Sequence, residues 1–148
     1  MSLKEDLSTE LKIAMKESNT DVKRVIRMVI ASVKNLEIDK GKLLNDDEVI
    51  SIIHKEIKSR NEVIDGARLS NRQDLINEAE NDIKILNRFL PEGLSHEELK
   101  KIVQETIVEV NAISISDMGK VMKLVLPKIG GRASGNEVSQ IVRELINN

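Results

Sequence analysis

Four basic residues cluster around a glycine pair near the carboxyl end of the chain. The stretch from residue 117 to residue 132 contains these four cations and one acid, Asp117, so it carries a net charge of +3 in a chain whose net charge is −2. The four basic residues are Lys120, Lys123, Lys128 and Arg132. Positive charge concentrated in this way suits phosphate, although the same lysines could simply decorate a solvated helix face.

The Gly130–Gly131 pair adds to the case for an anion site. It is predicted to form a turn that leads into a helix capped by Ser134. Unpaired amides and the positive dipole end at a helix N-terminus attract anions, so Ser134 and the amides after it join the candidate phosphate contacts. The alternative is that the glycine pair is only a turn.

Residues typical of catalysis are not arranged for it. His54 and His96 lie on different predicted helices, the chain has no cysteine, and no ligands stand at metal spacing. The acids we expect along solvated faces are Glu78, Asp82, Glu105 and Glu109. The segment from residue 130 to 135 lacks the Gly-Lys-Ser/Thr ending of a phosphate-binding loop. We therefore predict no catalytic residue, no metal and no cofactor.

Composition narrows the classes of protein further. With 148 residues and 40% hydrophobic side chains, the chain can form one domain or two small ones. Phe89 is the sole aromatic residue, so stacking of bases on aromatic rings is excluded. The absence of cysteine, of a signal-like apolar stretch and of a run long enough to cross a membrane predicts a cytoplasmic protein.

Helical periodicity predicts an all-α fold in which a helical N-terminal body, residues 1–92, precedes a small three-helix C-terminal bundle, residues 93–148. Seven helices are expected. Six of the predicted starts are marked by caps, at Ser2, Asn45, Ser70 (with Leu69 as a hydrophobic staple), Ser95, Ser116 and Ser134. The second helix is expected from Asp21 to about Asp39, with Gly41 ending it. The first helix is expected to end near Glu17, the third near Gly66, the fourth at Pro91 and the sixth at Pro127.

Two further features concern single helices. Lys23, Arg27 and Lys34 fall within about 40° of one another on the second helix and form an auxiliary basic patch. Pairing with acids of the same helix is the alternative explanation. Gly119 lies inside a helical pattern at a cost of about 1 kcal/mol relative to alanine, which predicts that a neighbouring helix or a ligand backbone approaches it closely.

Residues 117–142 resemble the tail of the GatB/YqeY family. The body is similar to the family as well, in residues 24–27, 35–38, 66–75 and 85–91, so the resemblance covers nearly the whole chain. It implies a helical body followed by a three-helix tail. In the family, the same tail closes the B subunit of the tRNA-dependent amidotransferases, where it touches tRNA. This chain departs from the family in having Ser134 where an aspartate is usual.

The resemblance implies a tRNA-binding accessory module. Its phosphate contacts would be Lys120, Lys123, Lys128, Arg132 and Ser134, with Lys23, Arg27 and Lys34 as the auxiliary patch. The partners implied are tRNA and an aminoacyl-tRNA or amidotransferase component, with no membrane. A protein-interaction adaptor that never touches RNA is the alternative. A third reading, carbon–nitrogen ligase activity with glutamine as amido-N-donor, rests on the family alone.

Overall fold

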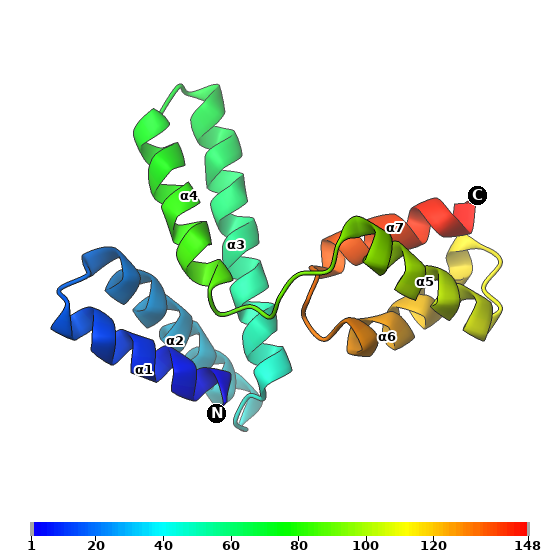
Figure 1. Cartoon of the computed structure of the whole chain (residues 1–148), viewed down its shortest axis with the longest axis horizontal. Helices are drawn as coiled ribbons and strands as arrows, with labels where there is room; N and C mark the ends of the chain where they lie inside the picture. The colour runs from blue at the N-terminus through cyan, green and yellow to red at the C-terminus, as the bar shows by residue number, and fades with distance from the viewer. Residues whose placement is uncertain (1, 148) are drawn as a thin grey trace. The chain divides into compact units, whose positions relative to one another are not determined.

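The computed structural model describes residues 2–147, and in that range the fold is all-α, as predicted (Figure 1). Seven α-helices and one short 3-10 helix account for the regular structure of the described residues. They are α1 (Leu3–Lys16), α2 (Thr20–Lys40), α3 (Asp46–Leu69), α4 (Gln73–Asn87), α5 (His96–Val110), the 3-10 helix η1 (Ile115–Asp117), α6 (Met118–Ile129) and α7 (Gly135–Asn147).

The chain divides between Leu90 and Pro91 into two compact units. The N-terminal unit contains α1 to α4, and the C-terminal unit contains α5 to α7. Each unit buries apolar side chains in clusters of its own. Each unit therefore has an apolar core of its own.

Helix α2 is the centre of the N-terminal unit. It buries Val22, Val25, Ile26, Val29 and Val33, a set too wide for a surface helix, and packs them against α1, α3 and α4. Beyond this core the far halves of α3 and α4 lie side by side and share a small cluster (Figure 1). That cluster consists of Ile64, Ala67, Ile76 and Ala79. The N-terminal unit thus holds two apolar clusters, and α3 and α4 take part in both.

Capping side chains set most helix starts in this unit. The Ser2 hydroxyl accepts a hydrogen bond from the Glu5 amide at 3.2 Å, and the Asn45 side chain accepts one from the Glu48 amide at 2.9 Å. Gly41 ends α2 in the left-handed conformation, at φ 67°. These boundaries agree with the predicted ones, except that α2 begins at Thr20 and not at Asp21, because the Asn19 side chain caps it by accepting from the Val22 amide at 3.2 Å.

The connection between α3 and α4 differs from the prediction. Helix α3 continues through Gly66 to Leu69, and Ser70 closes α3 instead of capping α4, because its hydroxyl donates to the carbonyls of Gly66 at 3.2 Å and Ala67 at 3.4 Å. Arg72 precedes α4 without a side-chain cap. The predicted staple is also wrong, since Leu69 is 90% exposed.

The C-terminal unit is a three-helix bundle, as predicted. Ser95 and Glu98 form a complete capping box, with the serine hydroxyl accepting from the Glu98 amide at 3.1 Å and the Glu98 carboxylate accepting from the Ser95 amide at 3.0 Å. The buried core draws three residues from each helix. They are Leu99, Val103, Ile107, Val121, Val125, Ile129, Val138, Ile141 and Val142.

Both predicted ends of the sixth helix are wrong. Ser116 does not cap it, because its hydroxyl lies 2.6 Å from that of Ser114, and α6 instead follows η1 without a side-chain cap. Pro127 lies inside α6, which runs on to Ile129 and ends at Gly130. Proline removes the hydrogen bond to the carbonyl four residues earlier and crowds that carbonyl, and α6 continues for only two residues beyond it.

Gly119 is not closely approached. A Cβ atom placed on it would meet no atom of a neighbouring element within 4 Å, and the residue is exposed. The predicted close contact with another helix is therefore wrong.

Candidate nucleic-acid interface

Helix α6 turns two of its three lysines to solvent. Val121, Val125 and Ile129 are buried in the bundle, so the opposite face of the helix points outward. Lys120 and Lys123, three residues apart, lie on that face, and both are exposed. Neither forms a hydrogen bond or an ion pair within residues 2–147. Their ammonium groups are available to an anion.

Asp117, the one acid of this stretch, is engaged by the backbone. Its carboxylate accepts a hydrogen bond from the Ile113 amide at 3.0 Å. This bond, followed by the Ser114 amide and the charge of Lys120, lowers the pKa of Asp117 below its usual range. The aspartate is thus a fixed negative charge that holds the turn before α6.

Lys128 is separated from the other two lysines. Its ammonium lies 2.7 Å from the Glu109 carboxylate and 3.1 Å from the hydroxyl of Thr106, both on α5. Eight residues separate Lys128 from Lys120, which rotates its side chain by about 80° around the helix. The structure therefore places Lys128 against α5 and balances its charge there.

Arg132 is fixed at the turn between α6 and α7. Gly130 and Gly131 both adopt positive φ, 57° and 81°, which glycine tolerates without strain. The Arg132 carbonyl accepts from the Leu94 amide at 3.0 Å, and its Nε donates to the Ile129 carbonyl at 3.2 Å. The side chain is exposed, and its guanidinium has further N–H groups that suit a phosphate.

Ser134 caps α7, as predicted. Its hydroxyl accepts a hydrogen bond from the Glu137 amide at 3.2 Å, and its side chain is half-buried. Glu137 also brings a carboxylate into the first turn of the helix. One of the amides predicted to bind an anion is therefore already used, and an acid competes with that anion at the helix start.

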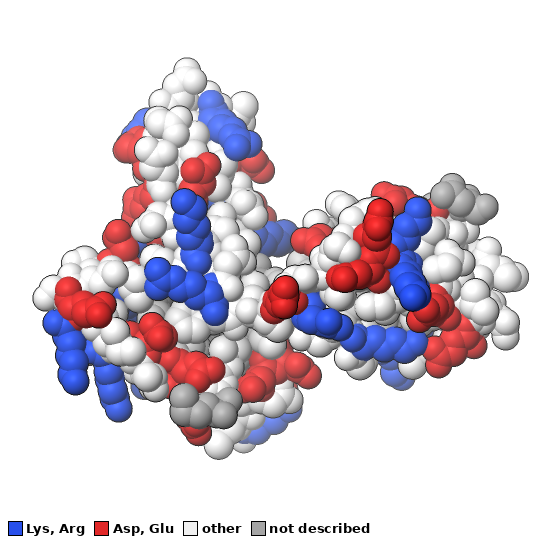
Figure 2. All heavy atoms as spheres, in the orientation of Figure 1, with Lys and Arg blue, Asp and Glu red and all other residues white. Residues whose placement is uncertain are grey.

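The basic site, defined as Lys120, Lys123, Lys128, Arg132 and Ser134, is thus only partly assembled for binding. Within the described residues Lys120, Lys123 and Arg132 form no ion pair, although the charge of Lys120 acts on Asp117, whereas Lys128 and Ser134 have internal partners. Figure 2 shows basic and acidic atoms next to one another on the visible face of the C-terminal unit. In the part of the chain with assigned positions, no group of three or more His, Asp or Glu side chains could hold a metal ion.

The auxiliary patch on α2 is not consumed by pairing within the helix. Arg27 and Lys34 are exposed and Lys23 is half-buried. Of the three acids of α2 expected as their partners, Asp21, Glu37 and Asp39, the first two pair with other residues. Asp21 lies 3.9 Å from Arg24, and Glu37 lies 2.9 Å from Lys4 of α1.

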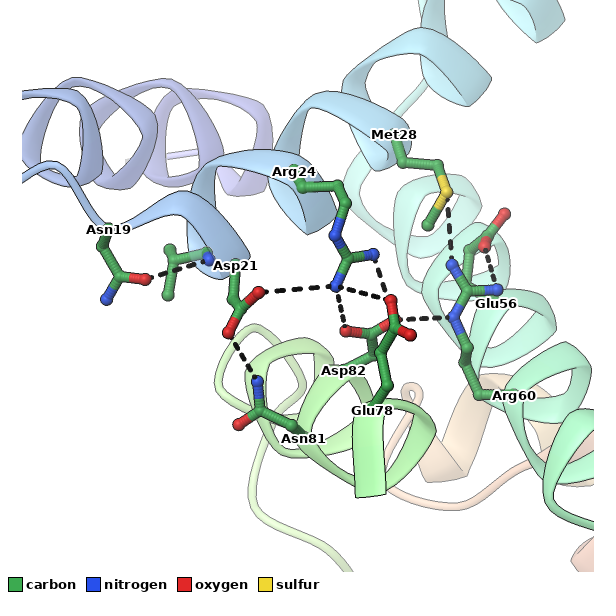
Figure 3. Close-up of polar contacts among 10 residues, drawn as sticks. Asn19, Asp21, Arg24, Met28, Glu56, Arg60, Glu78, Asn81 and Asp82 are labelled. Atoms are coloured by element: carbon green, nitrogen blue, oxygen red, sulfur yellow. Dashed lines mark hydrogen bonds and ion pairs between the residues drawn. The ribbon is translucent and has the colours of Figure 1, made fainter. Parts of the chain in front are cut away.

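An ion-pair cluster around Asp82 was missed by sequence reasoning (Figure 3). We expected Asp82 on a solvated face, yet it is 2% exposed. Arg24 of α2 donates two hydrogen bonds to the Asp82 carboxylate, of 2.7 and 3.2 Å. Arg60 of α3 donates a third to the same carboxylate from Nε, at 3.0 Å. Asp82 thereby raises the pKa of Arg24.

The Asp82 cluster joins three helices. Asp82 belongs to α4, so its carboxylate ties α2, α3 and α4 together between the two apolar clusters of the N-terminal unit. Both oxygens are occupied, which suits a structural tie more than an acid or base. A sequence signal was present, because Asp82 follows Ala79 by three residues on the apolar face of α4.

Comparison with known proteins identifies the family. The model of the Yqey-like protein family matches residues 4–146, nearly the whole chain. This chain belongs to the YqeY-like family. The resemblance inferred from sequence motifs is therefore confirmed at the level of the family.

Relatives of this YqeY-like protein occur among fungi. It is 27% identical to "Altered inheritance of mitochondria protein 41, mitochondrial" of Pyrenophora tritici-repentis over 143 residues, which cover 95% of this chain and 78% of the relative. A protein of the same name from Lachancea thermotolerans is 33% identical over 86 residues, 57% of this chain and 46% of the relative. An uncharacterized protein of Schizosaccharomyces pombe is 28% identical over 83 residues, which cover 56% of this chain and 68% of the relative. Within the described residues of this YqeY-like protein, no helix has the length and apolar character needed to cross a bilayer.

Proposed function

We propose that this YqeY-like protein is a tRNA-binding accessory module. The contact would be made by the C-terminal unit through Lys120, Lys123 and Arg132. The observation that carries the proposal is the exposed face of α6, on which both lysines form no hydrogen bond or ion pair within residues 2–147. Lys128 and Ser134 would contribute only after leaving Glu109 and the Glu137 amide.

The chemistry of the surface limits the mode of contact. With Phe89 as the only aromatic residue, bases cannot be read by stacking on rings. The lysines and the arginine would therefore meet phosphate oxygens, and binding would depend on the shape and charge of the folded RNA. Such a surface positions a tRNA without reading its sequence.

An accessory role is consistent with the family relationship. The tail of the amidotransferase B subunit is the part that touches tRNA, and this chain resembles that tail. We propose an aminoacyl-tRNA or an amidotransferase component as a further partner. The predicted cytoplasmic location stays a prediction, which cell fractionation would test, and relatives bear mitochondrial names.

The experiment is a tRNA binding titration with a charge-reversed variant. Lys120→Glu, Lys123→Glu and Arg132→Glu together should abolish the gel shift that the native chain gives. In the native chain, log K should fall by about 0.7 to 0.9 per neutralised phosphate for each tenfold rise in salt. The matched control is Lys12→Glu, Lys55→Glu and Lys58→Glu, three exposed lysines of the N-terminal unit, which changes the net charge equally. Equal binding by both variants would reject the site.

A protein-interaction adaptor is the second candidate function. Three apolar side chains near the end of α5, in the loop after it and at the start of η1 favour this reading, because they are exposed to solvent: Val108, Ile113 and Ile115. A partner held by this surface should remain bound after nuclease treatment and in high salt. Release by either treatment would favour the RNA-binding function instead.

A further inference from the structure

An open groove lies at the carboxyl end of α2 and in the turn before α3. It has a volume of about 450 Å³ and a mainly apolar lining. The residues around it are Lys34, Glu37, Ile38, Gly41, Lys42 and Leu43. Ile38 is 77% exposed and Leu43 is 78% exposed. Ile38 and Leu43 thus place a small exposed apolar patch beside the groove, and a partner's apolar side chains could cover it.

The groove continues a line of positive charge along α2. Lys34 borders the groove, Arg27 precedes it by seven residues and Lys23 by eleven, so the three side chains share one face of the helix. At 1.5 Å per residue the line is about 16 Å long. None of the three forms an ion pair within residues 2–147.

Two of the acids near the groove, Glu37 and Glu48, are engaged by other residues, which leaves Asp39 as an exposed acid beside it. The Glu37 carboxylate accepts from the Leu44 amide at 2.8 Å and from the Lys4 ammonium at 2.9 Å. Glu48 is engaged by Lys42 at 3.2 Å. Lys34, Arg27 and Lys23 therefore leave a net positive charge beside the apolar groove.

We propose that this α2 surface, made of the groove and of Lys23, Arg27 and Lys34, docks an acidic amphipathic segment of a partner protein. Aliphatic side chains of the segment would cover Ile38 and Leu43, and carboxylates would follow the line of cations. A phosphate backbone could satisfy the cations but has no aliphatic groups to fill the groove, which favours a protein over RNA. The surface belongs to the N-terminal unit and does not depend on the proposed tRNA function.

The test uses the full chain and a defined probe. The probe is a fluorescein-labelled synthetic helical peptide with paired leucines at one end and glutamates along the same face of the following turns. Binding is followed by fluorescence anisotropy, and methyl NMR of Ile38 and Leu43 reports where the peptide sits. The comparison peptide keeps the glutamates and replaces the leucines by serine.

Two variants separate the apolar and the charged parts of the surface. Ile38→Ser with Leu43→Ser should weaken peptide binding about tenfold, because two aliphatic contacts are lost. Arg27→Glu with Lys34→Glu should weaken binding by about tenfold at low salt and by less at high salt. All four side chains are absent from the buried core, so folding should be preserved, which circular dichroism checks.

Matched controls lie elsewhere on the same unit. Leu69→Ser removes an exposed leucine from the end of α3, and Lys55→Glu reverses an exposed lysine of α3. Both should leave peptide affinity unchanged. The proposal is overturned if the native chain does not bind the peptide, or if the serine-containing peptide binds equally well. It is also overturned if Ile38→Ser with Leu43→Ser abolishes binding to folded tRNA or to phosphatidylglycerol vesicles, because the groove would then serve those ligands.

Discussion

The ammonium of Lys128 lies 2.7 Å from the Glu109 carboxylate, a contact that ties α6 to α5. Lys120 and Lys123 of the same helix have no comparable partner in the described range. Three lysines of one helix thus differ in their availability to an anion, and this difference can be measured.

Releasing Lys128 should strengthen tRNA binding. Glu109→Gln removes the competing carboxylate, and because a partly exposed ion pair contributes about 1 kcal/mol or less, we expect affinity to rise by about two- to fivefold. Titrations at several salt concentrations should show a steeper slope, since one more phosphate is neutralised. Glu105→Gln, the same change one helical turn earlier on α5, is the control. An affinity that drops in Glu109→Gln would contradict this assignment.

Removing the Asp82 carboxylate should destabilise the N-terminal unit strongly. Asp82→Ala leaves Arg60, whose side chain is only 16% exposed, without its closest acid, and breaking such a buried pair costs about 3 kcal/mol. Urea denaturation of the full chain measures the loss. Glu78→Gln is the matched control, because Glu78 is exposed and lies 3.8 Å from Arg24, so its loss should cost about 0.5 kcal/mol or less. Equal costs for both variants would show that the cluster does not hold the helices together.

Gly119→Ala should stabilise the C-terminal unit. Space for a methyl group is free at this position, and alanine gains about 1 kcal/mol over glycine inside a helix. Gly130→Ala is expected to destabilise the unit instead. Gly130 adopts φ 57°, a conformation that costs a non-glycine residue about 1 kcal/mol. Thermal unfolding of the two variants gives the comparison. A destabilised Gly119→Ala protein would mean that a partner atom approaches the helix there.

Glu37 should make the stability of the N-terminal unit depend on pH in the acidic range. The Leu44 amide and then Lys4 lower the pKa of Glu37 in the folded chain. The ionised Glu37 side chain therefore adds to the free energy of unfolding in full above its pKa in the unfolded chain, about 4.3. This contribution is lost as the pH falls through the lower pKa of the folded chain. Glu37→Gln should be less stable than the native chain at pH 7, and the difference should shrink below about pH 4. Urea titrations at both pH values test this, with exposed Glu62→Gln as control.

Helix caps could be read from the sequence where their chemistry is complete within a few residues. The Ser2, Asn45, Ser95 and Ser134 side chains each accept from the amide three residues later, so the local pattern is sufficient. The same pattern failed at Ser70, where the carbonyls of the preceding helix offered a competing acceptor.

Features that depend on tertiary packing could not be read locally. The exposure of Lys120 and Lys123 follows from helical periodicity, whereas the capture of Lys128 requires Glu109, nineteen residues away on α5. Burial of Asp82 likewise depends on Arg24 and Arg60, which only the packing of three helices brings together. A charged residue within an apolar stripe was the visible sign of this arrangement.

No buried apolar cluster of the described residues combines side chains from before and after the Leu90–Pro91 junction. One half can consequently melt while the other keeps its packing, and a single melting temperature would conceal two events. Calorimetry should resolve two heat-absorption peaks, of which Asp82→Ala shifts one and Gly119→Ala the other.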